Sequence, residues 1–199
     1  IASSDIMNHP FLELLASKKL PILLSTGASS INEIKEAVRV IKKAGNNKIL
    51  IMHCTLCYPT KPQDANLLAI NDIKKNFPKN LIGLSDHTLG IEIATASVLY
   101  GVSTIEKHFT FNKKLSGPDH KSSIDGRELK MLVEGANANF LARGNIKKIF
   151  KKEKEIVNWA RESVVSIKKI LPGEKFNQKN ITTKSSMINI SGPPINKIM

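Results

Sequence analysis

Short apolar runs alternate with helical patterns four times along the chain. The runs cover residues 21–26, 48–54, 81–86 and 104–110, and the helical patterns cover 31–45, 66–77, 91–101 and 128–144. The runs are almost continuously apolar, which is typical of parallel strands buried on both faces. A strand–helix repeat of about 25–30 residues is that of a (β/α) barrel or of a doubly wound sheet, both in the α/β class.

The first repeat is preceded by a strand end at residues 1–4 and a short helical pattern over 9–18. We therefore expect residues 1–145 to form part of a TIM barrel, namely the C-terminal half of an eight-stranded one. Half a barrel leaves two unpaired sheet edges, and the sequence does not begin with Met. From these two features we expect a fragment of a longer protein.

The pattern changes after Gly144. Residues 146–160 are rich in lysine, which predicts a linker helix. Residues 161–199 predict a second, small module with two short β segments around the turn LPGE at 171–174.

The chain has a formal charge of +13 but only 5% aromatic residues. A strongly basic chain is one sign of nucleic-acid binding. Here the lysines are scattered over helix faces without stacking aromatic residues, so we expect no nucleic-acid partner. An anionic small substrate would be attracted to such a surface. No run of about 18 apolar residues is present, so we expect no membrane span, and two cysteines without an export signal indicate a reducing cytoplasm.

Polar side chains follow the predicted strands where each strand ends. In a barrel this is the rim at which the βα-loops build a site. Serines, acidic residues and histidines are all represented there. The segments are residues 3–5, 25–27, 53–58, 85–88 and 106–110.

His87 and His108 stand at the ends of consecutive predicted strands. Neighbouring strands are about 4.8 Å apart, so two imidazoles at these positions can share one metal ion. Two protein ligands leave positions open for water and substrate, which suits Lewis-acid catalysis better than a closed structural site. The alternative for each histidine is a hydrogen-bonded place in the core.

Two further segments are less specific. The hydroxyls and backbone N–H groups of residues 25–27 can hold a phosphate or carboxylate where a loop enters a helix, although Ser29 or Ser30 can simply cap that helix. Asp119, in the loop GPDHKSS at 117–123, can orient a sugar hydroxyl or cap the helix that follows.

Both cysteines lie in the segment HCTLCYP at 53–59, with the spacing C-x-x-C. In an extended chain, residues three apart have Cα atoms about 10 Å apart, whereas a disulfide needs under about 7 Å. No second pair is present to complete a zinc site. We therefore expect Cys54 to be a buried small residue behind the rim, with His53, Thr55 and Tyr58 bordering a substrate.

The motifs GLSDHT at 83–88, IEKHFT at 105–110 and GPDH at 117–120 make the sequence similar to the N-acetylneuraminate (sialic acid) synthase family. This family includes pseudaminic and legionaminic acid synthases and spore-coat polysaccharide synthases. STG at 25–27 and HCT with YPT within 53–60 match in the same order. The resemblance implies a TIM barrel followed by a small SAF (antifreeze-like) domain, here incomplete over 161–199.

The resemblance also implies an activity: phosphoenolpyruvate condenses with N-acetylmannosamine or a related N-acyl amino sugar and phosphate is released. Mn²⁺ or Mg²⁺ would be held by His87 and His108, which are the implied catalytic residues. The implied substrate-binding residues are Ser3, Asp5, Ser25, Tyr58, Ser85 and Asp119. Family members are domain-swapped homodimers in which the SAF domain covers the partner's site.

The sequence departs from the family pattern at several positions. Leu56 stands where many members have a polar residue, and Asp5 replaces a glutamate of some members. Lys184, Ser185 and Ser186 stand where Lys-Arg-Pro is common. A catalytic glutamate and a phosphate-binding lysine of the family would precede Ile1. The alternative to an active synthase is therefore a non-catalytic remnant or scaffold of such an enzyme.

Overall fold

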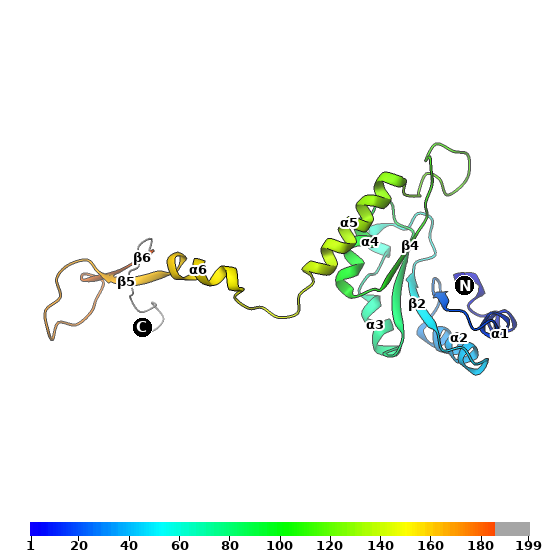
Figure 1. Cartoon of the computed structure of the whole chain (residues 1–199), viewed down its shortest axis with the longest axis horizontal. Coiled ribbons are helices and arrows are strands. Elements are labelled where there is room, and N and C mark those ends of the chain that lie inside the picture. Colours follow the sequence, from blue (N-terminus) through cyan, green and yellow to red (C-terminus); the bar gives the residue numbers. More distant parts are fainter. Residues whose placement is uncertain (186–199) are drawn as a thin grey trace. The chain divides into compact units, whose positions relative to one another are not determined.

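The computed structural model describes residues 1–185 (Figure 1). The chain divides into two compact units, residues 1–144 and residues 145–199. Each unit is described by itself below, and residues 186–199 of the expected SAF-like domain lie outside the described residues.

The first unit is built on a four-stranded parallel sheet with the order β1-β2-β3-β4 (Figure 1). The strands are β1 (Ile22–Ser25), β2 (Ile49–Cys54), β3 (Leu81–Asp86) and β4 (Thr104–Lys107). The α-helices of this unit are α1 (His9–Ser17), α2 (Ile31–Lys43), α3 (Ala69–Asn76), α4 (Glu92–Ser97) and α5 (Gly126–Ala142). Three short 3-10 helices complete it: η1 (Ser3–Asp5), η2 (Pro62–Asp64) and η3 (Val98–Tyr100). None of the helices in the described part of the chain combines the length and hydrophobicity needed to cross a membrane.

This architecture confirms the predicted α/β class and the parallel half-barrel sheet. The predicted helices differ from the observed ones by a few residues at their ends, and two of the differences have a local cause. The third begins at Ala69 rather than at residue 66, because Asn66 has a positive φ of 44° that interrupts a right-handed helix. The stretch 91–101 is the helix α4 followed by the tighter turn η3.

The two faces of the sheet bury different rows of side chains. Leu24, Ile51 and Ile82 are in register across β1, β2 and β3, and they are at most 3% exposed beneath the helices. On the opposite face, the row one residue earlier is Leu23, Leu50 and Leu81. Leu23 and Leu81 of that row are 39% and 64% exposed, so the core lies on the helix side of the sheet.

Helix α2 shows how the sequence pattern builds this core. Ile34, Val38 and Ile41 recur at helical spacing and are almost fully buried. Burying an aliphatic side chain of this size contributes roughly 1.5–3 kcal/mol. The helix therefore gains its stability from one apolar face packed on the sheet rather than from its lysine-rich exposed face.

Both ends of α2 have well-defined caps. The Ser30 hydroxyl accepts from Glu33 N, and the Glu33 carboxylate accepts from Ser30 N, which forms a capping box. At the other end Gly45 has a φ of 85°, and Lys19 Nζ donates to the carbonyls of Ala44 and Gly45. The cap is thus Ser30 and not Ser29, a choice that the sequence pattern had left open.

Replacing the capping hydroxyl gives a direct test of this end of the fold. We expect Ser30→Ala to lower the free energy of unfolding by about 1 kcal/mol, since the N–H of Glu33 loses its partner. Urea unfolding followed by circular dichroism measures the change. Ser29→Ala is the matched control, because the Ser29 hydroxyl donates only to Gly27 O. A larger loss in the Ser29 variant would contradict the assignment.

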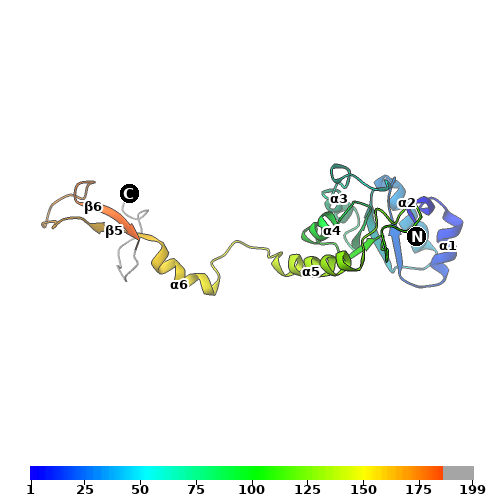
Figure 2. The ribbon, with the colours of Figure 1, turned by 90° about the horizontal axis from the view of Figure 1, so that it is seen from above.

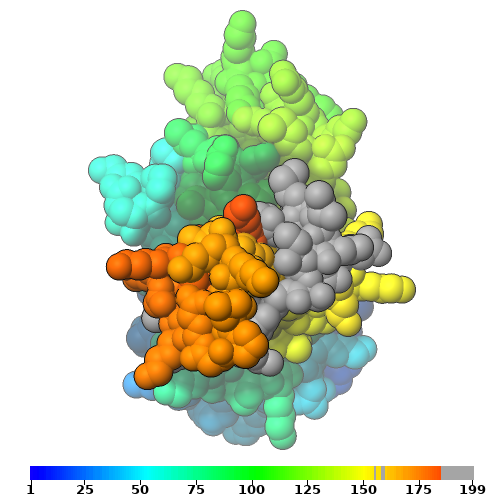
Figure 3. Space-filling model, turned by 90° about the vertical axis from the view of Figure 1, so that its left-hand side faces the viewer, coloured from blue at the N-terminus to red at the C-terminus, as the bar shows by residue number. Residues whose placement is uncertain are grey.

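The second unit contains helix α6 (Lys151–Ala160) and an antiparallel pair of strands, β5 (Glu162–Ser166) and β6 (Ile181–Ser185) (Figure 2). The predicted LPGE turn lies between them: Glu174 N donates to Leu171 O, and Gly173 has a φ of 86°. This is the backbone that a Pro-Gly pair favours in a type II turn. The connection between the strands forms surface of this unit, in orange in Figure 3. Its identity as an SAF domain is not shown.

Candidate functional site

Parallel pairing of β3 and β4 brings two polar motifs side by side. Ser85 is in register with Glu106, and Asp86 is in register with Lys107. His87 and His108 directly follow the last residues of β3 and β4. Their ring centroids are 5.3 Å apart, with an angle of 79° between the ring planes. The structure therefore places the predicted pair of histidines together at the carboxyl ends of the strands.

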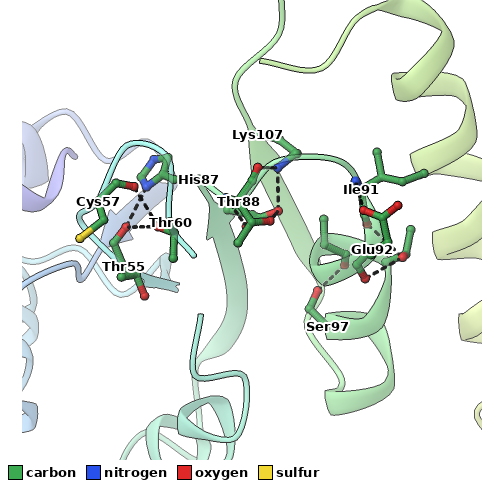
Figure 4. Close-up of polar contacts among 12 residues, drawn as sticks. Thr55, Cys57, Thr60, His87, Thr88, Ile91, Glu92, Ser97 and Lys107 are labelled. Carbon is green, nitrogen blue, oxygen red and sulfur yellow. Dashed lines mark hydrogen bonds and ion pairs between the residues drawn. The ribbon is translucent and has the colours of Figure 1, made fainter. Parts of the chain in front are cut away.

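The orientation of His87 is fixed by the loop that follows β2 (Figure 4). Its Nδ1 lies 2.9 Å from the carbonyl oxygen of Thr55. A carbonyl can only accept, so Nδ1 carries the proton and Nε2 presents a lone pair. Such a second contact on a histidine is the usual support for a metal ligand.

The spacing of the two rings suits a shared metal ion. Imidazole nitrogens bind a divalent ion such as zinc at about 2.0–2.1 Å, so two rings on one ion have centroids roughly 4.5–5.5 Å apart. The observed 5.3 Å lies in that range. Within residues 1–185 no group of three or more His, Cys, Asp or Glu side chains is arranged to hold a metal. The two histidines would therefore leave several positions for water or substrate.

Two loop residues border the histidines. The Tyr58 ring lies 4.1 Å from the His87 ring and 5.6 Å from the His108 ring, centroid to centroid. Asp119 Oδ2 lies 3.7 Å from His108 Nδ1, brought there by the glycine–proline loop after β4. Tyr58 and Asp119 are both about half exposed, so they are accessible to a ligand over the histidine pair.

Burial, the Cys54 thiol and the negative charges of Asp119 and Glu106 raise the pKa of Tyr58. Each of these disfavours a phenolate. The Tyr58 hydroxyl therefore stays protonated near neutral pH and can donate a hydrogen bond to an oxygen of a bound molecule.

Behind the histidines lies a buried thiol. Cys54 Sγ is 3.7 Å from Ser3 Oγ and 3.9 Å from His87 Nδ1. Ser85 is the register partner of Cys54 on β3. Cys54 and Cys57 are both unbridged, one buried and one exposed, which confirms that the C-x-x-C spacing forms no disulfide. Cys54 instead connects Ser3, Ser85 and His87.

Cys54 and His87 influence each other's ionisation. Burial alone would raise the pKa of the Cys54 thiol, but hydrogen bonds with His87, Ser3 and Ser85 lower it overall. Burial alone would lower the pKa of His87, but its contacts with Cys54 and the Thr55 carbonyl raise it overall. A metal ion binding at His87 must therefore compete with a proton.

Gly27 lets the chain pass closely over this group. A Cβ at this position would lie 2.9 Å from Ser3 Oγ and 3.2 Å from Cys54 Sγ. Its N–H donates to Ser3 Oγ at 2.9 Å. The STG segment therefore closes the site through a backbone approach that only glycine permits, and Ser3 is held in place by it.

The remaining predicted residues have weaker links to the group. Ser25 is buried at the end of β1, on the sheet face of Leu23, and Asp5 is half-buried in η1. Within residues 1–185 neither side chain forms a hydrogen bond with the histidine group. The expectation that His53 borders a substrate stays a prediction, and His53 lines a cavity beside the histidine group. His53 pairs in register with Leu84 of the core, and its Nε2 donates to Ala65 O on the helix side.

The structure adds three residues that the sequence motifs alone do not connect with the site, namely Asp86, Glu106 and Lys107. Glu106 accepts a 2.7 Å hydrogen bond from Ser85 Oγ. Lys107 donates to Asp86 Oδ2 at 2.8 Å and to Thr88 O at 2.6 Å (Figure 4). The signal that could have found them is the register itself, because aligning LSD with IEK pairs Ser85 with Glu106 and Asp86 with Lys107.

A cavity of about 740 Å³ lies beside this group, between the loops that follow β1 and β2. Cys54 and Thr55 line it together with the start of α2, but neither His87 nor His108 does. The chemistry that the histidines suggest therefore lies next to the cavity and not within it.

The loop that carries Asp119 is tied at several points. Thr110 Oγ1 lies 2.8 Å from His120 Nδ1, and Ile124 N donates to His108 O. Lys113 Nζ donates to the Glu128 carboxylate at the start of α5. Glu128 also accepts from Asp125 N in a capping box. One carboxylate thus connects the loop to the helix.

The Glu128 contacts predict a pH dependence of stability. The hydrogen bond from Lys113, with one from Asp125 N, lowers the pKa of Glu128 despite partial burial. A lowered folded pKa means stabilisation above the unfolded pKa that is lost as pH falls through the folded one. We expect Glu128→Gln to reduce the drop in unfolding free energy between pH 6 and pH 3, measured by urea unfolding.

The exposed Glu134, on the same helix, gives the matched control. Glu134→Gln should leave the pH dependence of wild type unchanged. Identical pH slopes for wild type and Glu128→Gln would show that this carboxylate does not stabilise the loop.

The fold and the rim together define half of a (β/α) barrel whose strand ends carry a polar site. The model of the NeuB family matches residues 1–148, and the chain belongs to this family. The resemblance inferred from the SDHT and EKHFT motifs is thereby confirmed.

Relatives and solved structures agree with this placement. The chain is 42% identical over 194 residues to an N,N'-diacetyllegionaminic acid synthase of Campylobacter jejuni, covering 96% of this chain and 58% of that protein. The N-acetylneuraminic acid (sialic acid) synthetase of Leptospira borgpetersenii, solved in complex with citrate, matches with a TM-score of 0.72 and 37% identity over 79% of this chain and 55% of that one. The spore coat polysaccharide biosynthesis protein SpsE of Bacillus subtilis matches with a TM-score of 0.68 and 35% identity over 92% and 55%.

The chain spans between half and three-fifths of the length of these relatives. The expectation that it corresponds to their C-terminal half is not confirmed, since these shares give length and not position.

Proposed function

We propose that this chain is part of a synthase that condenses phosphoenolpyruvate with an N-acyl amino sugar and yields a nonulosonic acid and phosphate. N-acetylmannosamine or a related sugar would be the acceptor. The observation that carries the proposal is the His87–His108 pair. The two ring centroids are 5.3 Å apart, and Nδ1 of His87 is hydrogen-bonded to the Thr55 carbonyl oxygen. Membership of a family whose relatives are named legionaminic and sialic acid synthases supports it.

His87 Nε2 and a nitrogen of His108 would hold the Mn²⁺ or Mg²⁺ ion. When bound there, such an ion polarises an aldehyde oxygen of the sugar. The Thr55 carbonyl keeps His87 in the tautomer that can act as a ligand. Asp119, beside His108, would orient that second ring and accept a hydrogen bond from a sugar hydroxyl.

The other groups act on the reacting carbons. C3 of phosphoenolpyruvate attacks the aldehyde carbon, positive charge develops at C2, water adds there, and phosphate leaves. The Glu106 carboxylate shares the barrel-facing side of the sheet with Ser85 and would stabilise that positive charge. Ser3, Ser25 and Ser85 would bind phosphoenolpyruvate, Asp5 would lie near its phosphate, and Tyr58 would donate to a substrate oxygen.

Metal binding gives the first test of this proposal. We expect the full chain to bind Mn²⁺, observed as loss of the free-ion signal in electron paramagnetic resonance. Either His87→Ala or His108→Ala should weaken binding at least about tenfold, since one of two protein ligands is removed. His9→Gln is the matched control, because His9 begins α1 and has no part in the rim. Unchanged Mn²⁺ affinity in both rim variants would remove the metal assignment.

Turnover gives the second test. Phosphate release from phosphoenolpyruvate is measured with Mn²⁺ and a panel of sugars that includes N-acetylmannosamine and bacillosamine-derived aldehydes. We expect release that needs both the sugar and the metal, with Tyr58→Phe reducing kcat/KM by roughly tenfold through a lost hydrogen bond. Mn²⁺ binding without phosphate release from any sugar would favour the alternative of a non-catalytic scaffold.

A homodimer with exchanged domains and a cytoplasmic location stay predictions.

A further inference from the structure

A fully buried ion pair lies directly beneath the two histidines. The Lys107 and Asp86 side chains are 3% and 2% exposed, and Lys107 Nζ is 2.8 Å from Asp86 Oδ2. The remaining hydrogen-bonding capacity is used locally. Asp86 Oδ1 accepts from Thr88 N at 2.9 Å, Asp86 Oδ2 accepts from Thr88 Oγ1, and Lys107 also donates to Thr88 O.

Stability alone does not account for such a pair. Removing two charges from water is costly, and replacing a buried pair with apolar residues of similar volume is often neutral or stabilising. A buried pair is best attested where it fixes one arrangement of the chain against others. The question is therefore which arrangement this pair fixes.

The pair connects the residues that immediately precede the two histidines. Asp86 comes before His87, Lys107 comes before His108, and the two are direct register partners across β3 and β4. The carbonyls that follow are also held: Thr60 N donates to His87 O, and Ile124 N donates to His108 O. The backbone of each histidine is thus fixed on both sides, and the Lys107–Asp86 ion pair adds a buried side-chain link between the two strands.

The ion pair does not itself border the rim. Asp86 shares a sheet face with Leu84 of the core, and Lys107 shares it with Ile105, whereas Ser85 and Glu106 share the opposite face. Lys107 therefore cannot contact a substrate that lies over the histidines. Any influence on chemistry must pass through the positions of His87 and His108.

We propose that the Asp86–Lys107 ion pair is a positioning device that sets the spacing of His87 and His108 for one divalent cation. This inference rests on the proposed metal site and adds two residues to which no role in it was assigned. A slip or splay of β4 against β3 would separate the imidazoles by several ångströms. The buried pair opposes that movement because it would take each buried charge away from its oppositely charged partner.

The experiment compares three variants with wild type: Lys107→Met, Asp86→Asn, and the double variant. Each single replacement leaves a buried group without its partner, so both stability and Mn²⁺ affinity should fall. The double replacement removes both charges while it keeps the volumes similar. We expect its free energy of unfolding to recover toward wild type, while its Mn²⁺ dissociation constant stays about tenfold or more above wild type, as is typical when outer contacts of a metal site are lost.

Two further measurements separate positioning from general damage. Co²⁺ replaces Mn²⁺ as a probe, and the visible absorption of the bound ion should change in the double variant because its ligand geometry changes. Lys130→Met is the matched control: it removes another lysine–carboxylate pair of the same unit, the exposed pair with Glu134 on α5, and should leave both Mn²⁺ affinity and the Co²⁺ spectrum as in wild type.

Each outcome has a distinct meaning. A folded double variant with wild-type Mn²⁺ affinity and Co²⁺ spectrum would overturn the positioning role while the metal site stands. Absence of Mn²⁺ binding in wild type itself would overturn the metal site and this inference together. Loss of affinity in the control as large as in the double variant would also overturn the positioning role, since charge and not geometry would then be responsible.

Discussion

Backbone hydrogen bonds between β3 and β4 join two segments that are 21 residues apart, and the candidate site depends on the register of that pairing. Ser85 meets Glu106 and Asp86 meets Lys107, so His87 and His108 leave the sheet at neighbouring positions. Successive side chains of a strand point to opposite faces, so the polar residues of the two motifs divide between the two faces of the sheet. The barrel-facing side carries the Ser85–Glu106 hydrogen bond, and the helix-facing side carries the buried ion pair.

The same principle explains why a short strand can be both core and site. In β2, Ile51 is completely buried beneath the helices, and Cys54, three residues on, lies on the other face beside Ser3 and His87. The apolar residues at the start of each strand pack in the core and fix the position of the strand. The polar residues at its end are positioned by that packing. The geometry of the polar rim therefore depends on how the apolar residues earlier in each strand pack in the core.

The sequence was sufficient for the elements and for the histidine pair. Apolar runs, capping residues and glycines are local signals, and they gave the four strands and the helices within a few residues. The position of His87 and His108 followed because strand ends meet at one edge. The pairing of Glu106 with Ser85 and of Lys107 with Asp86 depends on strand register, which no local signal in the sequence encodes. Strand alternation turns His53 toward the helices, on the sheet face opposite to Cys54. Loop conformations, which bring Tyr58 and Asp119 to the histidines, have no periodic pattern from which to derive them.

The hydrogen bond from His87 to the Thr55 carbonyl joins the end of β3 to the loop that follows β2. Thr55 begins the loop after β2, and its hydroxyl in turn donates to Asp64 O at the far end of that loop. A main-chain carbonyl cannot be replaced by substitution, only displaced. Insertions or deletions between residues 55 and 64 would therefore rotate a candidate metal ligand without altering any ligand residue. Remodelling of this loop would therefore change the presentation of His87 in the same step.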